Sequence, residues 1–168
     1  APLYGAMSRT PAEKAYNLHF IDKYSGIKKW HQNLQTEAIK NKCITLPTGR
    51  QFAFPHAKRT KTGGATGATK IKNYPVQSLA TADIVPLCLV ALREELQKNK
   101  LRTTIVNTVH DSVLLDCPNE EVDRVEQLVE DVLSPSSTKD RIYLYYNINM
   151  DVPLPIDTKT GSNWLNMS

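Results

Sequence analysis

A histidine and an aspartate lie side by side between two apolar runs near the middle of the chain. His110 and Asp111 separate residues 103–109 from residues 112–116, and both runs are rich in β-branched and leucine side chains. Such runs favour strands, so the pair is expected at the bend of a hairpin. An aspartate at a bend is placed either for chemistry or for stabilising the turn through its own backbone. These residues alone leave both alternatives open.

The apolar patterning on either side predicts the elements that must position this pair. Residues 73–98 read as a helix that is capped by Asn73 and kinked at Pro86. After the hairpin, an amphipathic helix is expected over residues 120–133 and a last strand over residues 142–149. Helices beside an antiparallel sheet make the expected fold class α+β.

The amino-terminal part carries its own predicted elements. Two helices are expected, over residues 11–24 and 27–42, with a break at Ser25 and Gly26 between them. A hairpin is expected over residues 43–54. These elements would precede the long helix in the chain.

Charge is unevenly spread along the 168 residues, although the formal net charge is only +4. Residues 1–77 hold 13 Lys and Arg against 3 acidic residues, whereas residues 78–168 hold 8 against 14. The basic part includes a Gly- and Thr-rich stretch, residues 56–70, that reads as a mobile cationic loop. This loop is either solvated or bound to phosphate, and phosphate binding would weaken steeply with salt.

Five segments together resemble the C-terminal part of family A DNA polymerases, the group of bacterial DNA polymerase I and phage replicases. They occur in the family's order and span nearly the whole chain: Tyr4-Gly5, residues 45–50, residues 73–84, His110-Asp111 and residues 161–164. The resemblance implies a partial polymerase palm of phage type, in which an antiparallel sheet with packed helices follows the end of the fingers helices. Residues 1–72 would be the fingers remnant with its basic loop, and residues 73–168 the C-terminal part of the palm.

The resemblance also implies a chemistry, DNA-directed DNA synthesis by two Mg²⁺ ions. Asp111 would be a catalytic, metal-binding residue, with His110 beside it near the primer terminus. Hard carboxylate oxygens suit Mg²⁺, and a metal pair is about 4 Å apart. Asp116 is the only other acid on the hairpin, and five extended residues put it roughly 17 Å from Asp111. Asp116 is therefore expected to be an exposed strand end, and the family's first aspartate must come from elsewhere.

Further residues would contact substrates. Asn73 and Gln77 lie one helical turn apart and can reach minor-groove acceptors that are similarly placed in every base pair, so they would sense duplex geometry without reading sequence. The alternative for Asn73 is a plain helix cap. Tyr4 and Gly5 would lie at the deoxynucleoside triphosphate, where a buried aromatic is the alternative for Tyr4. Phosphates of the primer-template would meet Arg50, Lys58, Arg59, Lys61, Lys70 and Lys72.

Cellular location follows from cysteine usage and hydropathy. Cys43, Cys88 and Cys117 lie far apart without zinc-ligand spacing, which favours a reduced intracellular protein. The longest apolar run, residues 84–92, is too short to cross a bilayer, and the start of the chain does not read as a secretory segment. We expect the cytoplasm of a bacterium or of a phage-infected host, and no membrane partner.

Three hypotheses about function stay open. The favoured one is the C-terminal subunit or fragment of a family A DNA polymerase, inactive without a larger N-terminal polymerase chain that brings the first aspartate. The second is a non-catalytic DNA-binding or scaffold module of a replication complex. The third is a metal phosphohydrolase, although His19, His31 and His56 lie far from His110 in the sequence.

The sequence departs from the family pattern at two positions. Ser78 stands where a glycine is usual, and Ser112 stands where an acid is common.

Overall fold

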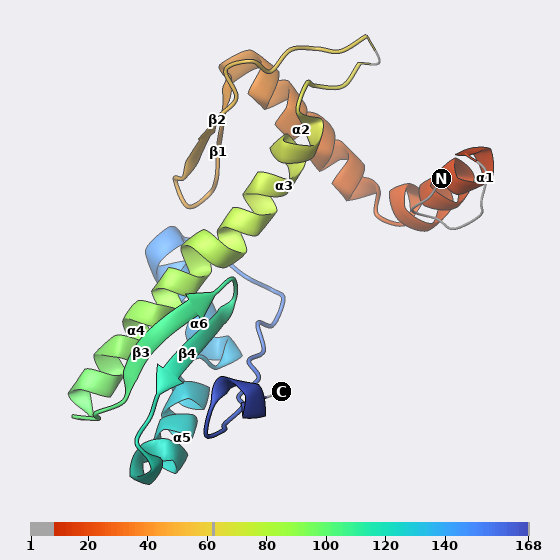
Figure 1. Ribbon diagram of the computed structural model, residues 1–168. Coiled ribbons are helices and arrows are strands. Elements are labelled where there is room, and N and C mark those ends of the chain that lie inside the picture. Colours follow the sequence, from red (N-terminus) through yellow and green to blue (C-terminus); the bar gives the residue numbers. More distant parts are fainter. Residues whose placement is uncertain (1–8, 62, 168) are drawn as a thin grey trace. The chain divides into compact units, whose positions relative to one another are not determined.

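The computed structural model describes residues 9–61 and 63–167 (Figure 1). Its contacts divide the chain into two compact units, Ala1–Pro75 and Val76–Ser168. Helices and two separate antiparallel hairpins make up these units, which confirms the α+β class. The division of the chain into fingers and palm remains a proposal.

The first unit begins with two helices that differ from expectation at their junction. α1 (Arg9–Tyr16) continues as the wide π-turn η2 (Asn17–Asp22), and two residues separate η2 from α2 (Ser25–Asn41). The predicted break at Ser25 and Gly26 is therefore wrong by two residues, because these two form the first turn of α2. Lys42 ends α2 in a left-handed conformation, with φ 57°.

The core of the first unit lies where α2, the first hairpin and the start of the long helix meet. The hairpin pairs β1 (Cys43–Thr45) with β2 (Gln51–Ala53), which confirms the predicted turn around Gly49, whose φ is +86°. Only the C-terminal half of α2 reaches the core, since Trp30 is 38% exposed. The buried apolar residues are Leu34, Ala38, Ile44, Leu46, Ala57, Ala65 and Ile71.

One continuous helix, Ala68–Lys98, consists of α3 (Ala68–Ser78), the π-turn η3 (Leu79–Ile84) and α4 (Val85–Lys98). It begins five residues before the predicted start, so Asn73 lies inside the helix and is not its cap. The disturbance expected at Pro86 takes the form of η3, where the Val85 amide donates to the Ala80 carbonyl five residues back. A wide turn gives room to a proline ring that would otherwise clash with the preceding turn.

By length and composition alone, this 31-residue helix would also suit a membrane crossing, a property that it shares with core helices of globular proteins. Its last part, α4, packs against α5, α6 and β3 within the second unit. These contacts bury Ala91, Leu92 and Leu96. The apolar composition of α4 is therefore explained in part by its place in this core.

The second unit is built around α4 and the central hairpin (Figure 1). β3 (Thr104–Val109) pairs with β4 (Ser112–Asp116), and η4 (Asn119–Glu121) leads into α5 (Val122–Val132). The hairpin and α5 confirm the sequence prediction. The register shifts between Ile105 and Asn107, which leaves Val106 as a bulge. The buried cluster comprises Ala91, Leu92, Leu96, Val125, Val132 and Leu133.

The predicted last strand, residues 142–149, is wrong. The chain forms a helix there, α6 (Pro135–Tyr146), which starts at the cap Ser134 and ends at Asn147 in a left-handed conformation. The Ser134 side chain accepts from the Ser137 amide, and Pro135 occupies the first turn, where a proline costs no hydrogen bond. The strand prediction rested on the alternation of side chains over residues 142–149, which outweighed this start signal. Among the described residues, the sheet of this unit therefore has two strands only.

Candidate functional site

The bend of the central hairpin presents His110 and Asp111 to solvent. Val109 and Ser112 form the last pair of the ladder, and His110 adopts a left-handed φ of 56°. The turn is stabilised by Ser112, whose hydroxyl donates to the Val109 carbonyl over 2.9 Å. The Asp111 carboxylate makes no hydrogen bond or ion pair with any residue that the structure describes. Turn stabilisation is thus carried out by another side chain, and the Asp111 carboxylate is available for a ligand.

The opposite end of the hairpin is held by Glu121. Its carboxylate accepts the backbone amides of Arg102 and Thr103, each over 3.0 Å, and the Thr103 hydroxyl over 2.8 Å. The same hydroxyl lies 3.3 Å from the Cys117 sulfur at the end of β4. The hydrogen bond from the Arg102 amide, together with those from Thr103, lowers the pKa of Glu121. Because Glu121 precedes α5 directly, these bonds tie both ends of the hairpin to that helix.

The outer edge of β3 is open. No third strand pairs with β3 within residues 9–61 and 63–167, and its bulge residue Val106 and its last residue Val109 are 53% and 41% exposed. An open edge presents unpaired backbone amides and carbonyls, which another strand can bind. The hairpin therefore offers both a carboxylate at its tip and a pairing surface along its side.

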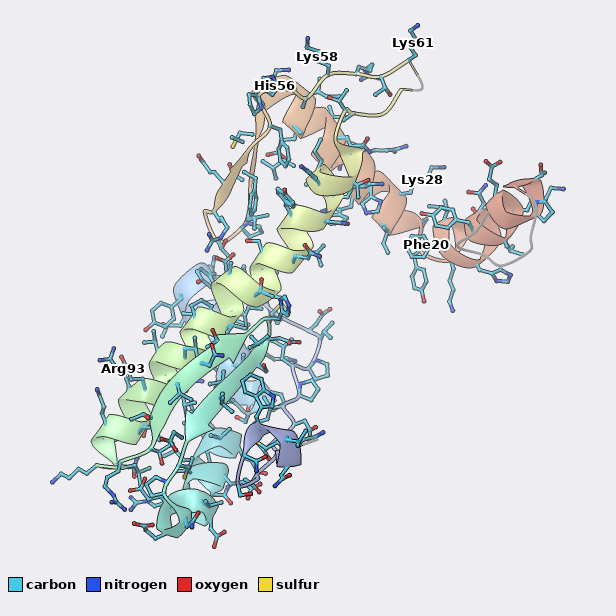
Figure 2. All side chains as sticks on the ribbon, viewed as in Figure 1. Phe20, Lys28, His56, Lys58, Lys61 and Arg93 are labelled. Atoms are coloured by element: carbon cyan, nitrogen blue, oxygen red, sulfur yellow. The ribbon has the colours of Figure 1, made fainter. Side chains whose placement is uncertain are left out.

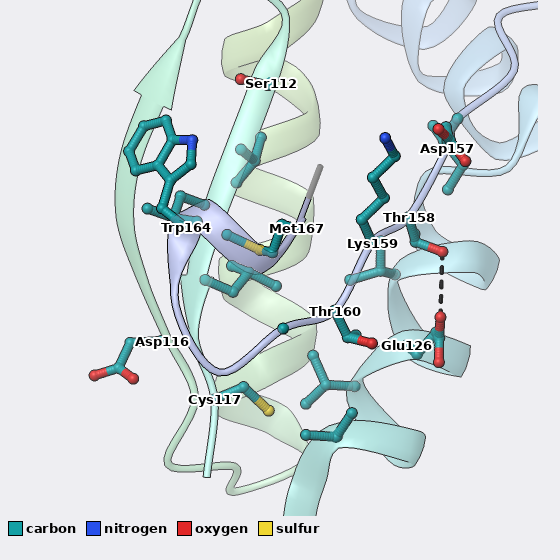
Figure 3. Close-up of a pocket in the computed structure, with 18 of the residues that line it drawn as sticks. Ser112, Asp116, Cys117, Glu126, Asp157, Thr158, Lys159, Thr160, Trp164 and Met167 are labelled. Atoms are coloured by element: carbon teal, nitrogen blue, oxygen red, sulfur yellow. Dashed lines mark hydrogen bonds between the residues drawn. The ribbon is translucent and has the colours of Figure 1, made fainter. Parts of the chain in front are cut away.

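A cavity of about 1110 Å³ lies beside β4 (Figure 3), between that strand, α5 and the C-terminal segment 155–167. Asp111 and Asp116 both line it, as does Trp164, which is 59% exposed. The segment is tied to α5 by the Thr158 hydroxyl, which is 3.4 Å from the Glu126 carboxylate. Asp116 is an exposed strand end, in line with the sequence interpretation.

The turn that carries Trp164 depends on a glycine. η5 (Trp164–Met167) folds back so tightly that a Cβ added at Gly161 would lie 3.0 Å from the Asn166 backbone. The Asn166 amide donates to the Asn163 carbonyl, and its side chain donates to the Ser162 hydroxyl, both over 3.1 Å. The glycine at position 161 of the segment 161–164 thus has a local steric reason: a larger residue would collide with the Asn166 backbone.

The basic residues predicted to contact phosphate lie in the first unit. Lys58, Arg59, Lys61 and Lys70 are exposed, Lys72 is half-buried on α3, and Arg50 is exposed just before β2. Burial and the nearby Lys72 ammonium lower the pKa of His31. Tyr4 and Gly5, the candidate triphosphate contacts, lie outside the described residues.

Asn73 and Gln77 are both exposed on α3, one helical turn apart. Side chains with this spacing share a face of the helix, so the two amides can reach one ligand together. The backbone carbonyl of Gln77 accepts a hydrogen bond from the Thr81 hydroxyl over 2.8 Å, so this bond does not occupy the Gln77 side chain. Their side-chain amides are the groups left for recognition.

No group of three or more His, Cys, Asp or Glu side chains that could hold a metal ion occurs among the described residues. Asp111 is thus a single carboxylate at the hairpin tip, and Cys43, Cys88 and Cys117 are free thiols. Neither Glu121 nor the cavity beside β4 was predicted from the sequence. Glu120 and Glu121 directly before α5 could have indicated a helix start, since acidic residues favour the first turn of a helix. The cavity could not be predicted, because no local sequence pattern indicates it.

Comparison with known proteins decides the family. The sequence profile of DNA polymerase family A matches residues 5–166. The chain belongs to DNA polymerase family A. Among its relatives within this family, DNA polymerase I of Lactococcus lactis subsp. lactis is 28% identical over 153 residues, which are 90% of this chain and 16% of the relative. DNA polymerase I of Bacillus caldotenax is 26% identical over 166 residues, 96% of this chain and 18% of the relative.

A solved polymerase structure supports the fold. The POL domain of Pol1 from M. smegmatis, in complex with DNA primer-template and dNTP, has a TM-score of 0.70 and 21% sequence identity. The match covers 89% of this chain and 24% of that one. The chain thus spans about 16 to 18% of the curated relatives' length, and its helices and hairpins correspond to part of a polymerase domain.

Proposed function

We propose that this chain contributes one metal-binding carboxylate, Asp111, to DNA-directed DNA synthesis at a primer terminus. The observation that carries the proposal is the Asp111 carboxylate itself, which is exposed at the hairpin tip and has no described partner. Ser112 stabilises the turn and Glu121 holds the hairpin base, so the tip is positioned without using that carboxylate. His110 lies beside it and would be near the primer terminus.

The cofactor that fits Asp111 is Mg²⁺, because a free carboxylate oxygen is the ligand that this ion prefers. Two bound Mg²⁺ ions would supply charge neutralisation at the phosphates. One carboxylate supplies at most two of the oxygen ligands that two Mg²⁺ ions need, and no further ligand cluster lies in the described residues. The remaining ligands must therefore come from another polymerase segment.

The partner we propose is a larger polymerase chain that carries the first aspartate and the triphosphate-binding residues, in a polymerase of phage type. The open β3 edge supports this, because it can pair with a strand of that partner. We expect this chain alone to be inactive, and we place the complex in the cytoplasm of a bacterium or of a phage-infected host.

The proposed substrates are a primer-template and a deoxynucleoside triphosphate, the ligands named for the M. smegmatis structure. Asn73 and Gln77 would bind minor-groove acceptors, since both amides are exposed on one face of α3. Phosphates would meet Arg50, Lys58, Arg59, Lys61, Lys70 and Lys72. Tyr4 and Gly5 would contact the triphosphate.

The test is complementation of synthesis in vitro. The 168-residue chain is mixed with an N-terminal family A polymerase fragment that carries the first aspartate and the triphosphate-binding residues, and primer extension is followed with Mg²⁺. Asp111→Asn keeps the shape of the side chain and should lower extension by orders of magnitude, whereas Asp116→Asn, the matched change at the other end of β4, should leave it unchanged.

Four outcomes would contradict this proposal. A mixture as inert as its parts would remove the shared catalytic site, and DNA binding without synthesis would favour the scaffold hypothesis. Equal losses in Asp111→Asn and Asp116→Asn would show that charge on the hairpin matters but that Asp111 has no special role. Hydrolysis of nucleotides by the isolated chain would instead favour the phosphohydrolase hypothesis.

A further inference from the structure

The basic stretch after the first hairpin, expected to be a mobile loop, makes regular hydrogen bonds in its described parts, residues 56–61 and 63–70. Arg59 and Ala65 form a β-bridge, and the Thr60 amide donates to the Gly64 carbonyl over 2.8 Å. Thr66 closes the base, because its hydroxyl accepts the Lys58 amide and donates to the His56 carbonyl, both over 3.0 Å. We call residues 56–61 and 63–67 the basic hairpin.

A side chain of α2 anchors the basic hairpin. The Gln35 carbonyl oxygen accepts the Ala65 amide over 2.9 Å, and its amide group donates to the His31 carbonyl over 3.1 Å. Gly64 permits this approach, since a Cβ added there would lie 3.2 Å from the same Gln35 oxygen. One glutamine thus sets the position of the basic hairpin against α2.

Between the basic hairpin and α2 lies a polar groove of about 450 Å³. One wall is a single face of α2, and the other is Arg59 with the exposed Gly63 and the half-buried Gly64. The α2 wall comprises Gln32, Gln35, Thr36 and Ile39. None of the described residues that line the groove is acidic, and the surrounding unit is strongly basic.

The charges beside the groove have no described ion-pair partner. Lys58, Arg59 and Lys61 are exposed, and none forms a salt bridge with a residue in the described part of the chain. Figure 2 shows the Lys58 and Lys61 side chains extending outward from the basic hairpin. Arg59 alone of the three lines the groove. The cationic side chains on the rim attract an anionic ligand. Inside the groove, the glutamine side-chain amides and the Thr36 hydroxyl can hydrogen-bond the uncharged parts of that ligand.

We propose that this groove binds an unpaired stretch of the template strand. A groove of this volume admits one strand, whereas a duplex could touch only its rim. Arg59 would contact a phosphate, the glycine backbone would allow the strand to approach closely, and Gln32 and Thr36 would hydrogen-bond the sugar or base. This inference rests on the proposed function, because it gives the template a place on the first unit. Gln35 is a positioning residue, since it holds the basic hairpin through Ala65.

The experiment compares binding to two DNAs by fluorescence anisotropy with the 168-residue chain at one salt concentration. One DNA is a blunt duplex, and the other is the same duplex with an unpaired 5′ extension. Wild type should bind the extended DNA more tightly. Gln32→Glu places a like charge beside the strand and should weaken the extended complex about fivefold, the factor expected for charges roughly 4 Å apart in water. Blunt-duplex binding should not change.

The matched control is Asn33→Glu, an identical charge change at the next residue of α2, which is exposed but does not line the groove. A second variant, Gln35→Met, should speed hydrogen exchange at the Ala65 amide and reduce the preference for the extended DNA. On a single-stranded oligonucleotide, Arg59→Gln should lower the slope of log affinity against log salt by about 0.7.

The inference is overturned if wild type shows no preference for the extended DNA, or if Gln32→Glu and Asn33→Glu weaken it equally. Failure of the proposed function looks different. In that case, the groove variants behave as stated, but extension in the complemented mixture does not depend on Asp111.

Discussion

The strongest test of the fold concerns α6, where strand and helix predict different buried residues. Along a strand, Ile142 and Leu144 point to the same face. Along a helix, they lie about 200° apart. The structure places Ile142 at 0% exposure and Leu144 at 76% exposure. Alanine at each position therefore distinguishes the two conformations.

The expected magnitudes follow from these exposures. Ile142→Ala removes a fully buried side chain and should cost about 2–5 kcal/mol in the free energy of unfolding, from lost burial and the cavity left behind. Leu144→Ala removes an exposed side chain and should change it by about 0.5 kcal/mol or less. Urea unfolding followed by circular dichroism measures both, and the first variant should shift the midpoint by about 1–2 M.

Equal losses for the two variants would refute the helix, because only a strand buries both side chains on one face. A neutral Ile142→Ala would refute the packing of α6 on its neighbours. The m-value serves as the control, since an unchanged m shows that the midpoint shift reports stability.

Two further predictions concern the hairpin base and the C-terminal turn. Because the pKa of Glu121 is lowered, its carboxylate stabilises the folded state above the ordinary glutamate pKa, and this contribution is lost as pH falls through the lowered value. Glu121→Gln should be less stable at neutral pH and should lose less stability on acidification, measured as urea midpoints at several pH values; parallel pH curves would contradict this. Gly161→Ala should speed hydrogen exchange at the Asn166 amide, because the added Cβ meets backbone, whereas Gly26→Ala, with nothing within 4 Å, should not affect it.

Local patterns predicted the central hairpin and α5 well. Runs rich in β-branched and leucine residues on both sides of His110 and Asp111 favour extended chain, and the polar pair between them favours a bend. Val125 and Val132 recur at helical spacing and are buried in α5. In both cases the signal lies within a few residues, so no distant contact was needed to read it.

Local patterns failed where two signals competed. At α6, the alternation of Ile142, Leu144 and Tyr146 suggested a strand, but the Ser134 cap and burial of Ile142 favour the helix. At Asn73, a good capping residue suggested a helix start, but the helix already begins at Ala68, after Gly67 with φ +72°. A cap residue is tolerated inside a helix when its side chain faces solvent, as Asn73 does.

The sequence by itself determined that a carboxylate stands at a hairpin bend and that the first half of the chain is basic, because both depend only on neighbouring residues. Only the tertiary structure decided that Ser112 and Glu121 support the hairpin, that Gln35 orders the basic hairpin, and that no second carboxylate joins Asp111 within the described residues. Several of these facts join residues far apart in the chain, such as Glu121 with Arg102 and Gln35 with Ala65. Their energies arise from packing and hydrogen bonding in the folded state, which periodicity along the sequence does not encode.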